Sequence, residues 1–390
     1  MGPALGYNVP MELTHKERYI RLFRGEPVDR APFYLIMGPS RQALDRWSGE
    51  GLEVEIDRND DMSYRRASAK VRDMFGFDTN RGYMLGVRAF VWPEYPEEVT
   101  EENDDFVYIR TKWGSLKRRP KQVGRMALQE TPPVTDWESW EQMKERLRAE
   151  TPGRLPDNWP EVCAQAHATD FPVYTGDLPI GFFGGPRELV GTEGLCTMFY
   201  DDPALISDIL DTLCDLWIDI YTKVYRDAPF DYFFVWEDMC YKNGPLISPE
   251  VFRTFLLPRY KRLTSALKDA GVKLIMVDSD GDTRKLVPLW VEGGVDITFP
   301  WETQYGLDIT TVRKQFPTVG MIGGVNKSAL ACGKEAIDVE LEKVAWMLEQ
   351  GRYLPGLDHE TPPEVPWNAF KYYCERLRDL VWQHIPKATR

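Results

Sequence analysis

The feature that most constrains the fold of this chain is a regular alternation between short apolar runs and longer amphipathic segments. The apolar runs have the length of buried strands, and most of the segments between them have the length and periodicity of helices. The runs lie near residues 33–37, 171–176, 231–236, 272–277, 295–299, 318–322 and 352–355. Strands that alternate with helices are joined by right-handed crossovers, and this order predicts a parallel sheet. Six or seven such units favour an α/β fold with a single (β/α)8 barrel of the TIM type over an open sheet.

Capping signals mark the ends of several predicted helices. Thr14 and Glu17 form a capping box, and Gly25 is the matching stop signal. Elsewhere a proline follows an N-cap residue, or glycines flank an amphipathic stretch. The helices predicted from these signals lie near residues 16–24, 203–227, 249–270 and 334–350. No GxGxxG motif follows the first apolar run, which excludes the dinucleotide-binding form of an open sheet.

The segment from about residue 84 to 165 breaks the alternation. A short β-like stretch on each side of Lys112-Trp113-Gly114 predicts an antiparallel hairpin, and a helix that carries tryptophans is expected around 136–149. We interpret this segment as an insertion packed on the barrel rather than as a second domain. The prediction is one barrel domain over residues 1–390, in which residues 1–30 form an N-terminal helical extension.

The composition of the chain excludes several classes of protein. The formal net charge is −13, so the chain lacks the basic surface that nucleic-acid binding needs. No apolar run approaches the roughly 18 residues of a membrane span, and we therefore expect no membrane partner. The six cysteines include no CxxC pair, a pattern typical of reduced thiols in a cytoplasmic protein. We expect a cytoplasmic protein that acts on a small molecule, and an oligomer is possible.

Acidic residues stand where several apolar runs end. Val277 is followed directly by Asp278, with Asp280 two residues further on, and Trp236 is followed by Glu237. The carboxyl ends of barrel strands face one common mouth, so these side chains are expected to meet there. Asp278 and Asp280 share one face of an extended segment, and neighbouring carboxylates repel each other unless a cation or a proton lies between them.

The strand ends therefore predict a metal site or a general acid–base site at the mouth. His359 follows the last apolar run and completes the set, although a histidine between two acids is more often a solvated loop residue. The catalytic candidates are Glu237, Asp278 and His359, and the candidate metal ligands are Glu237, Asp278, Asp280 and His359. Asp282 is expected to cap the helix that follows it. Other strand ends supply the candidates for substrate binding, which are Arg41, Met37, Asp177, Trp301 and Asn326.

Several segments, taken in order along nearly the whole chain, resemble a known superfamily. They are Thr14-His15-Lys16-Glu17-Arg18, Pro27-Val28-Asp29-Arg30-Ala31-Pro32, Gly181-Phe182-Phe183-Gly184-Gly185-Pro186, Leu246-Ile247-Ser248-Pro249-Glu250-Val251-Phe252 and Gly323-Gly324-Val325-Asn326-Lys327. The superfamily is that of the uroporphyrinogen decarboxylases and the related corrinoid-dependent methyltransferases. The resemblance implies a single βα barrel, in agreement with the alternation of runs.

The two branches of this superfamily imply different sites. Decarboxylases grip the carboxylates of their tetrapyrrole with two arginines after the first strand; Arg41 matches one of them and Met37 stands at the other. Their tyrosine is replaced here by Thr192, whereas their histidine is matched by His359. Methyltransferases hold zinc through His-x-Cys and a later Cys. At those positions this sequence carries Asp278-Ser279-Asp280 and His359, which are oxygen and imidazole donors.

The resemblance is closer to the methyltransferase branch. It implies methyl transfer between a small methylated substrate and a corrinoid carried by a separate partner protein, with a divalent metal at Glu237, Asp278, Asp280 and His359. Zinc is the first candidate for that metal, and carboxylates with one imidazole suit manganese or iron equally. The alternative is a decarboxylase or other lyase without metal, in which Arg41 binds a substrate carboxylate and Asp278 or His359 handles the proton. A third reading is a ligand-binding barrel without activity.

Overall fold

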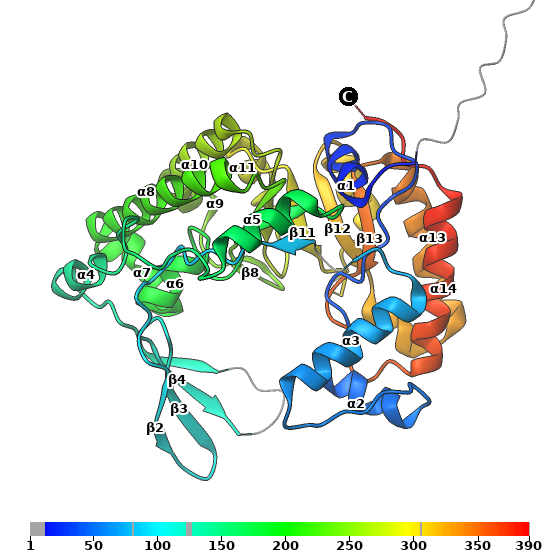
Figure 1. Cartoon of the computed structure of the whole chain (residues 1–390), viewed down its shortest axis with the longest axis horizontal. Coiled ribbons are helices and arrows are strands. Elements are labelled where there is room, and N and C mark those ends of the chain that lie inside the picture. The colour runs from blue at the N-terminus through cyan, green and yellow to red at the C-terminus, as the bar shows by residue number, and fades with distance from the viewer. Residues whose placement is uncertain (1–11, 80–81, 122–126, 305, 390) are drawn as a thin grey trace, which may run out of the picture. The chain divides into compact units, whose positions relative to one another are not determined.

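The computed structural model describes residues 12–79, 82–121, 127–304 and 306–389 (Figure 1). The chain forms two compact units, and each of them is built from separate stretches of sequence. Unit 1 comprises Met1–Tyr83, Thr169–Val173 and Asp296–Arg390, and unit 2 comprises Met84–Ala168 and Tyr174–Val295.

Seven strands form the main sheet, in the order β1-β6-β7-β10-β11-β12-β13. Their bounds are β1 Tyr83–Met84, β6 Val173–Gly176, β7 Tyr232–Trp236, β10 Leu274–Asp278, β11 Ile297–Trp301, β12 Gly320–Val325 and β13 Tyr353–Leu357. Pairing is parallel between β6 and β7, between β7 and β10, and along β11, β12 and β13. The strands from β6 onwards are almost entirely buried, as expected for a parallel sheet with apolar runs. The predicted α/β fold with a parallel sheet is confirmed.

The expected first strand at residues 33–37 is wrong. Tyr34 and Pro39 make only isolated bridges, to Thr79 and Thr361 respectively, so no continuous ladder forms over this segment. The later apolar runs all became strands, so the error is confined to this segment. Among the described residues the main sheet therefore has seven strands, and closure into a ring of eight remains a prediction.

Unit 2 carries the helices that follow β6, β7 and β10. They are α6 Gly184–Val190, α7 Thr192–Asp201, α8 Pro203–Asp227, α9 Pro249–Val251, the π-helical turn η1 Phe252–Leu256, α10 Leu257–Ala270 and α11 Val287–Glu292. Helix α8 begins at the N-cap Asp202 with proline in its first turn, as its sequence predicts. It lies beside α10, and its apolar face is buried (Figure 1). Two short strands, β8 Cys240–Tyr241 and β9 Gly244–Pro245, form a small hairpin after β7.

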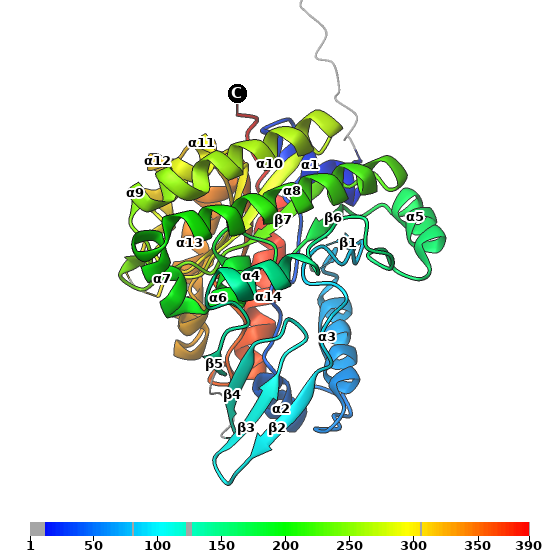
Figure 2. The same cartoon turned by 90° about the vertical axis from the view of Figure 1, so that its left-hand side faces the viewer.

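The segment that breaks the alternation forms an antiparallel sheet of four strands in unit 2 (Figure 2). The strands are β2 Glu98–Glu102, β3 Phe106–Arg110, β4 Leu116–Pro120 and β5 Leu128–Thr131, and the helices α4 Trp137–Lys144 and α5 Trp159–Ala168 follow. Strands β3 and β4 pair from Arg110 with Leu116 outwards, so the predicted hairpin is confirmed. An ion pair of 2.6 Å between Lys117 in β4 and Glu188 in α6 connects this hairpin to the helix.

Unit 1 carries the remaining helices. They are α1 His15–Arg24, α2 Arg41–Gly49, α3 Asp61–Phe75, α12 Ile309–Gln315, the 3-10 helix η2 Lys327–Cys332, α13 Lys334–Gln350 and α14 Trp367–Gln383. The capping box at Thr14 and the left-handed Gly25 are both present and bound α1 as predicted. The indole of Trp47 lies 4.6 Å from the ring of Phe370 and 5.0 Å from that of Trp367, and this aromatic cluster joins α2 to α14.

Two further expectations concern the whole chain. All six cysteines are free thiols, as predicted. Among the described residues, no helix combines the length and the apolar character that a membrane crossing requires.

Candidate functional site

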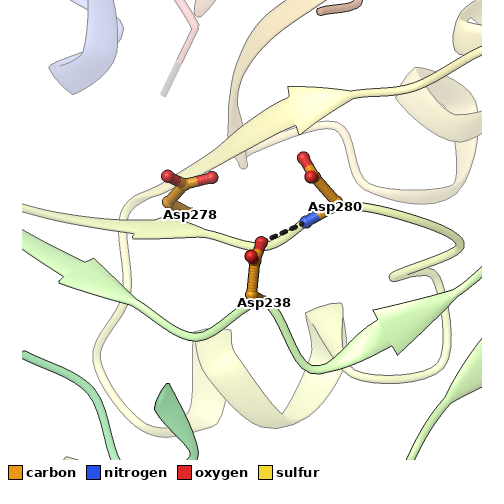
Figure 3. Close-up of side chains that lie close together, drawn as sticks. All are labelled: Asp238, Asp278 and Asp280. Carbon is orange, nitrogen blue, oxygen red and sulfur yellow. Dashed lines mark hydrogen bonds between the residues drawn. The ribbon is translucent and has the colours of Figure 1, made fainter. Parts of the chain in front are cut away.

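Three aspartates meet in unit 2, where β7 and β10 end. Asp238, Asp278 and Asp280 are all half-buried, and one oxygen from each lies within 4.8 Å of the others. Figure 3 shows Asp278 at the end of its strand and Asp238 facing Asp280, whose backbone N–H donates to Asp238 Oδ1 at 3.4 Å. We call these three residues the aspartate cluster.

The register of the sheet explains why these residues converge. Asp278 pairs with Trp236, so the residues that follow both strands leave the sheet at the same level. The N–H of Glu237 then donates to the Asp278 carbonyl at 2.8 Å. Asp238 takes a left-handed backbone conformation, with φ of 45°, which turns its side chain away from the direction of Glu237.

Further contacts hold the two loops together below the cluster. The buried Ser279 accepts a hydrogen bond from the Met239 N–H at 3.1 Å, and Asp282 donates its N–H to the Tyr241 carbonyl at 3.1 Å. Gly281 adopts φ of 82°, and a Cβ there would lie 2.9 Å from the backbone of Tyr241. A glycine is needed here because a side chain would separate the loops.

The carboxylate of Glu237 points into the protein and is fully buried. It accepts hydrogen bonds from the N–H groups of Phe182, Phe183 and Gly184 at 2.9, 2.6 and 3.0 Å, and from the hydroxyl of Tyr260. The three N–H groups belong to the start of α6, which has no side-chain cap of its own. Burial raises the pKa of Glu237, and the four donors oppose that rise. Glu237 therefore caps α6 from a neighbouring strand.

Arg187 provides the cation next to the aspartate cluster. Its guanidinium donates to the Asp238 carbonyl at 2.8 Å, lies 3.7 Å from the Asp238 carboxylate and stacks over the Trp236 ring at 4.6 Å. Arg187 thus places a positive charge beside the aspartate cluster and offsets part of its negative charge. Asp282 is bound by Arg284 through two side-chain contacts of 2.8 Å. Arg284 lowers the pKa of Asp282 and engages its carboxylate outside the cluster. The predicted capping role of Asp282 is wrong, because the next helix, α11, begins only at Val287 and has Leu286 as its N-cap residue.

The donor set of the cluster fits a hard divalent cation. Metal–oxygen bonds of roughly 2.0 to 2.6 Å allow ligand oxygens to lie up to about 4 to 5 Å apart, and the three oxygens of the cluster lie within 4.8 Å of one another. All three donors are carboxylates, and this chemistry suits magnesium, manganese or calcium. Zinc also accepts carboxylate ligands, but its usual sites contain histidine or cysteine, and the described members of the cluster include neither.

His359 lies in unit 1, after β13. It is half-buried and lines a cavity of about 20 Å³ together with Thr361 and Tyr373. Its neighbour Asp358 is completely buried and accepts hydrogen bonds from the N–H and hydroxyl of Thr303, both at 3.1 Å, and from the N–H of Lys327 at 3.0 Å. Asp358 thus ties together the loops that follow β11, β12 and β13.

Two of the predicted substrate-binding residues are engaged within unit 1. Trp301 is 2% exposed, and its indole N–H donates to the Thr298 hydroxyl at 3.0 Å. The side chain of Asn326 accepts from the Ser328 N–H at 2.9 Å and caps η2. Both side chains therefore contribute to the local structure, and contact of either with a substrate remains a prediction.

The other three predicted substrate-binding residues differ in exposure and in their contacts. Arg41 begins α2, is exposed, and pairs with Asp61 at 2.8 Å. Met37 is half-buried and lines two hollows in unit 1. Asp177 follows β6 in unit 2 with φ of 79°, and its carboxylate accepts from the Leu178 N–H at 2.9 Å.

Sequence reasoning missed two residues of the site. Asp238 joins Asp278 and Asp280, whereas Glu237 turns inward. Arg187 directly follows the motif Gly184-Gly185-Pro186, whose sequence indicates at most a weak anion-binding turn and does not predict a place beside the aspartates. The left-handed backbone conformation at position 238 directs the side chains of Glu237 and Asp238 to different sides. Aspartate is one of the few residues other than glycine that adopt this conformation readily.

A separate cavity of about 730 Å³ lies in unit 2. It is bounded by β4, β5 and the junction of α6 with α7, and Thr192 is one of its lining residues. No member of the aspartate cluster lines it.

Comparison with known proteins identifies the family. The sequence model of the uroporphyrinogen decarboxylase (URO-D) family matches residues 131–380, which is more than half of the chain. The chain belongs to the uroporphyrinogen decarboxylase family, and the family predicted from the sequence motifs is confirmed.

Two curated relatives are both uroporphyrinogen decarboxylases. The protein of Syntrophotalea carbinolica is 26% identical over 211 residues, covering 49% of this chain and 57% of the relative. The protein of Nocardia farcinica is 24% identical over 196 residues, covering 47% and 52% respectively. The chain thus spans about half the length of the curated relatives that it matches.

A solved structure shares the fold. The methyltransferase from Methanosarcina mazei superposes with a TM-score of 0.56 and 15% sequence identity, covering 94% of this chain and 99% of that one. At this identity the likeness concerns the fold alone, because one barrel-type fold can host unrelated reactions.

Proposed function

We propose that this chain is an enzyme of the family that removes a methyl group from a small molecule with the help of a divalent cation at the aspartate cluster. The observation that carries the proposal is the convergence of Asp238, Asp278 and Asp280 within 4.8 Å. Three carboxylates facing one another repel strongly, and a bound cation relieves that repulsion. The revised ligand set replaces Glu237 by Asp238, since four donors already engage the Glu237 carboxylate.

The proposed ion would act as a Lewis acid on the heteroatom that carries the methyl group, so that this atom becomes a better leaving group. The protein residues around it hold the ligands in place. Arg187 fixes Asp238 through its carbonyl and reduces the local negative charge, and Ser279 fixes the loop between Asp278 and Asp280. His359 as a further ligand, and a corrinoid protein as the methyl acceptor, belong to the proposal as well.

The choice of methyl transfer rests on sequence features of the family. Met37 and Thr192 stand at the positions where the decarboxylase branch holds an arginine and a tyrosine. Asp278-Ser279-Asp280 stands where the methyltransferase branch binds its metal. A site with oxygen donors at the metal position is easier to reconcile with metal-assisted chemistry than with metal-free decarboxylation.

The first prediction concerns metal binding. We expect the purified chain to bind about one equivalent of manganese or magnesium, with zinc tested in parallel by calorimetry and elemental analysis. Substitutions D238N, D278N and D280N should each weaken binding by about tenfold or more, because each removes a charged ligand. The matched control is D282N, which changes an acid in the same loop that is bound to Arg284 instead.

Two results would refute the metal site. One is the absence of stoichiometric binding by the unsubstituted chain for all three ions. The other is a loss of affinity in D282N as large as in D278N, because that would indicate binding to a diffuse acidic surface.

Decarboxylation is the second candidate, because both curated relatives are uroporphyrinogen decarboxylases. Incubation with uroporphyrinogen separates the two proposals. Release of carbon dioxide that persists in the presence of a chelator would favour the decarboxylase. Conversion of cob(I)alamin to methylcobalamin in the presence of methylated amines, thiols or ethers, and its loss in D278N, would favour methyl transfer.

A further inference from the structure

A hollow of about 390 Å³ lies in unit 1 between helix α3 and the segment that precedes α2. We call it the α3 hollow. Its lining residues are Leu35, Met37, Gly38, Arg65, Ser68, Ala69 and Arg72. The volume falls within the range of small-molecule sites, which is roughly 300 to 1,000 Å³.

The sequence of α3 builds one wall of this hollow. Arg65, Ser68, Ala69 and Arg72 are spaced i, i+3, i+4 and i+7, so they share one face of the helix. The two small residues leave the middle of that face open, and the two arginines stand at its ends. Two helical turns separate the arginines, which is about 10 Å along the axis.

The opposite wall is formed by extended backbone. Gly38 has φ of 74°, and a Cβ at this position would lie 3.3 Å from the Ser68 hydroxyl oxygen. Its carbonyl accepts the N–H of Thr361 at 2.9 Å, which anchors the wall. The side chains of Leu35 and Met37 add an apolar surface that can contact a carbon skeleton.

The charges at the hollow are positive and weakly compensated. The side chain of Arg65 makes no hydrogen bond or ion pair with the described residues. Among the same residues the guanidinium of Arg72 pairs with its exposed neighbour Asp73 at 2.9 Å and with no other acid. None of the described residues that line the hollow is acidic. In contrast, Arg66 on the same helix pairs with Asp60 at 2.9 Å and does not line the hollow.

We infer that the α3 hollow binds a small organic dicarboxylate, with one carboxylate at Arg65 and the other at Arg72. Guanidinium groups match carboxylates in geometry as well as in charge. The inference goes beyond the proposed function, since it assumes neither a metal nor methyl transfer, and its success or failure is measured by binding alone.

The experiment measures binding of a dicarboxylate series to the full chain by calorimetry at low ionic strength, from succinate to suberate, with inorganic phosphate for comparison. We expect the affinity to peak at a chain length that spans both arginines. R65Q and R72Q should each weaken the best ligand by about tenfold, because each removes a charge-assisted contact. A69L should abolish binding by filling the hollow without a change in charge, and R66Q is the matched control that should bind like the unsubstituted chain.

Three outcomes would overturn the inference. The first is that no dicarboxylate binds the unsubstituted chain. The second is that R66Q loses as much affinity as R65Q, which would indicate unspecific attraction to the helix. The third is that A69L binds normally, or that phosphate and all dicarboxylates bind alike, because either result would show that the hollow does not hold a molecule with two charged ends.

Discussion

Glu237 and Asp238 are neighbours in the chain, yet their carboxylates have opposite surroundings. The former is buried and satisfied by four hydrogen-bond donors, whereas the latter is 29% exposed and lies beside two other carboxylates. A buried carboxylate is stable only with such partners. The two residues therefore have different roles: Glu237 caps helix α6, and Asp238 is a proposed cation ligand.

This division predicts different effects of removing the two charges. We expect E237Q to lower the free energy of unfolding by about 2 to 4 kcal/mol, because the amide presents an N–H group to donors that need an acceptor. D238N should change it by less than about 1 kcal/mol, as half-exposed pairs contribute little. Urea unfolding without added metal measures both.

One outcome of these two measurements would contradict the prediction. Equal destabilisation by E237Q and D238N would show that both carboxylates are structural. In that case the proposed division of roles between Glu237 and Asp238 would be refuted.

At the scale of elements, close approach between α6 and the end of β7 shapes the site. A Cβ on Gly181 would lie 2.0 Å from the Trp236 carbonyl oxygen, and one on Gly184 would lie 2.3 Å from the same atom. These glycines let the first N–H groups of α6 reach Glu237, and they bring Arg187 on the same helix over Trp236. The glycine motif noted in the sequence therefore has a packing role that also positions the cation.

We expect G181A to destabilise the chain by about 2 to 3 kcal/mol, because the added methyl group collides with backbone that cannot move freely. G194A is the control, since a Cβ on Gly194 in α7 would meet no atom within 4 Å. An alanine inside a helix is favoured over glycine by roughly 0.5 to 1 kcal/mol, so this control should be neutral or stabilising. Thermal unfolding of both variants tests the argument, and a tolerated G181A would contradict it.

At the scale of the whole molecule, the chain keeps many carboxylates ionised despite its net charge of −13. Asp78 is an example from unit 1. Arg30 donates to both of its oxygens at 2.7 and 2.8 Å, and the His15 ring nitrogen lies 3.6 Å away. Burial alone would raise the pKa of Asp78, but His15 and Arg30 outweigh it and hold the pKa well below its ordinary range. Asp29 is held down in the same way by Arg18.

Because the pKa of Asp78 is lower in the folded chain than in the unfolded chain, acid lowers the free energy of unfolding. Ionised Asp78 contributes its full stabilisation of the fold above the pKa that it has in the unfolded chain, about 4. This stabilisation is lost as the pH falls below that value. We therefore expect the urea midpoint to fall steadily below about pH 4. D78N should be less stable at pH 7 and should lose less on acidification. A D78N profile parallel to that of the unsubstituted chain between pH 5 and pH 3 would contradict this assignment.

Local sequence patterns predict most of the helices and strands correctly. The apolar runs from β6 to β13 became strands, and the capping signals placed α1, α8, α10 and α13, because periodicity and caps act locally. The strand predicted at 33–37 is wrong because a continuous strand needs a pairing partner along its whole length. A local pattern does not show whether such a partner is present. The motifs also identified the family, since their order along the chain is a property of sequence alone.

Local patterns do not show which carboxylate faces the site, because contacts between separate elements set its position. The register of β7 against β10 and the left-handed backbone at Asp238 place this residue, rather than Glu237, beside Asp278 and Asp280. Arg187 joins them through close packing of glycines that are remote in sequence from β7. Such contacts depend on distances between separate elements, and a pattern read along one chain contains no information about those distances.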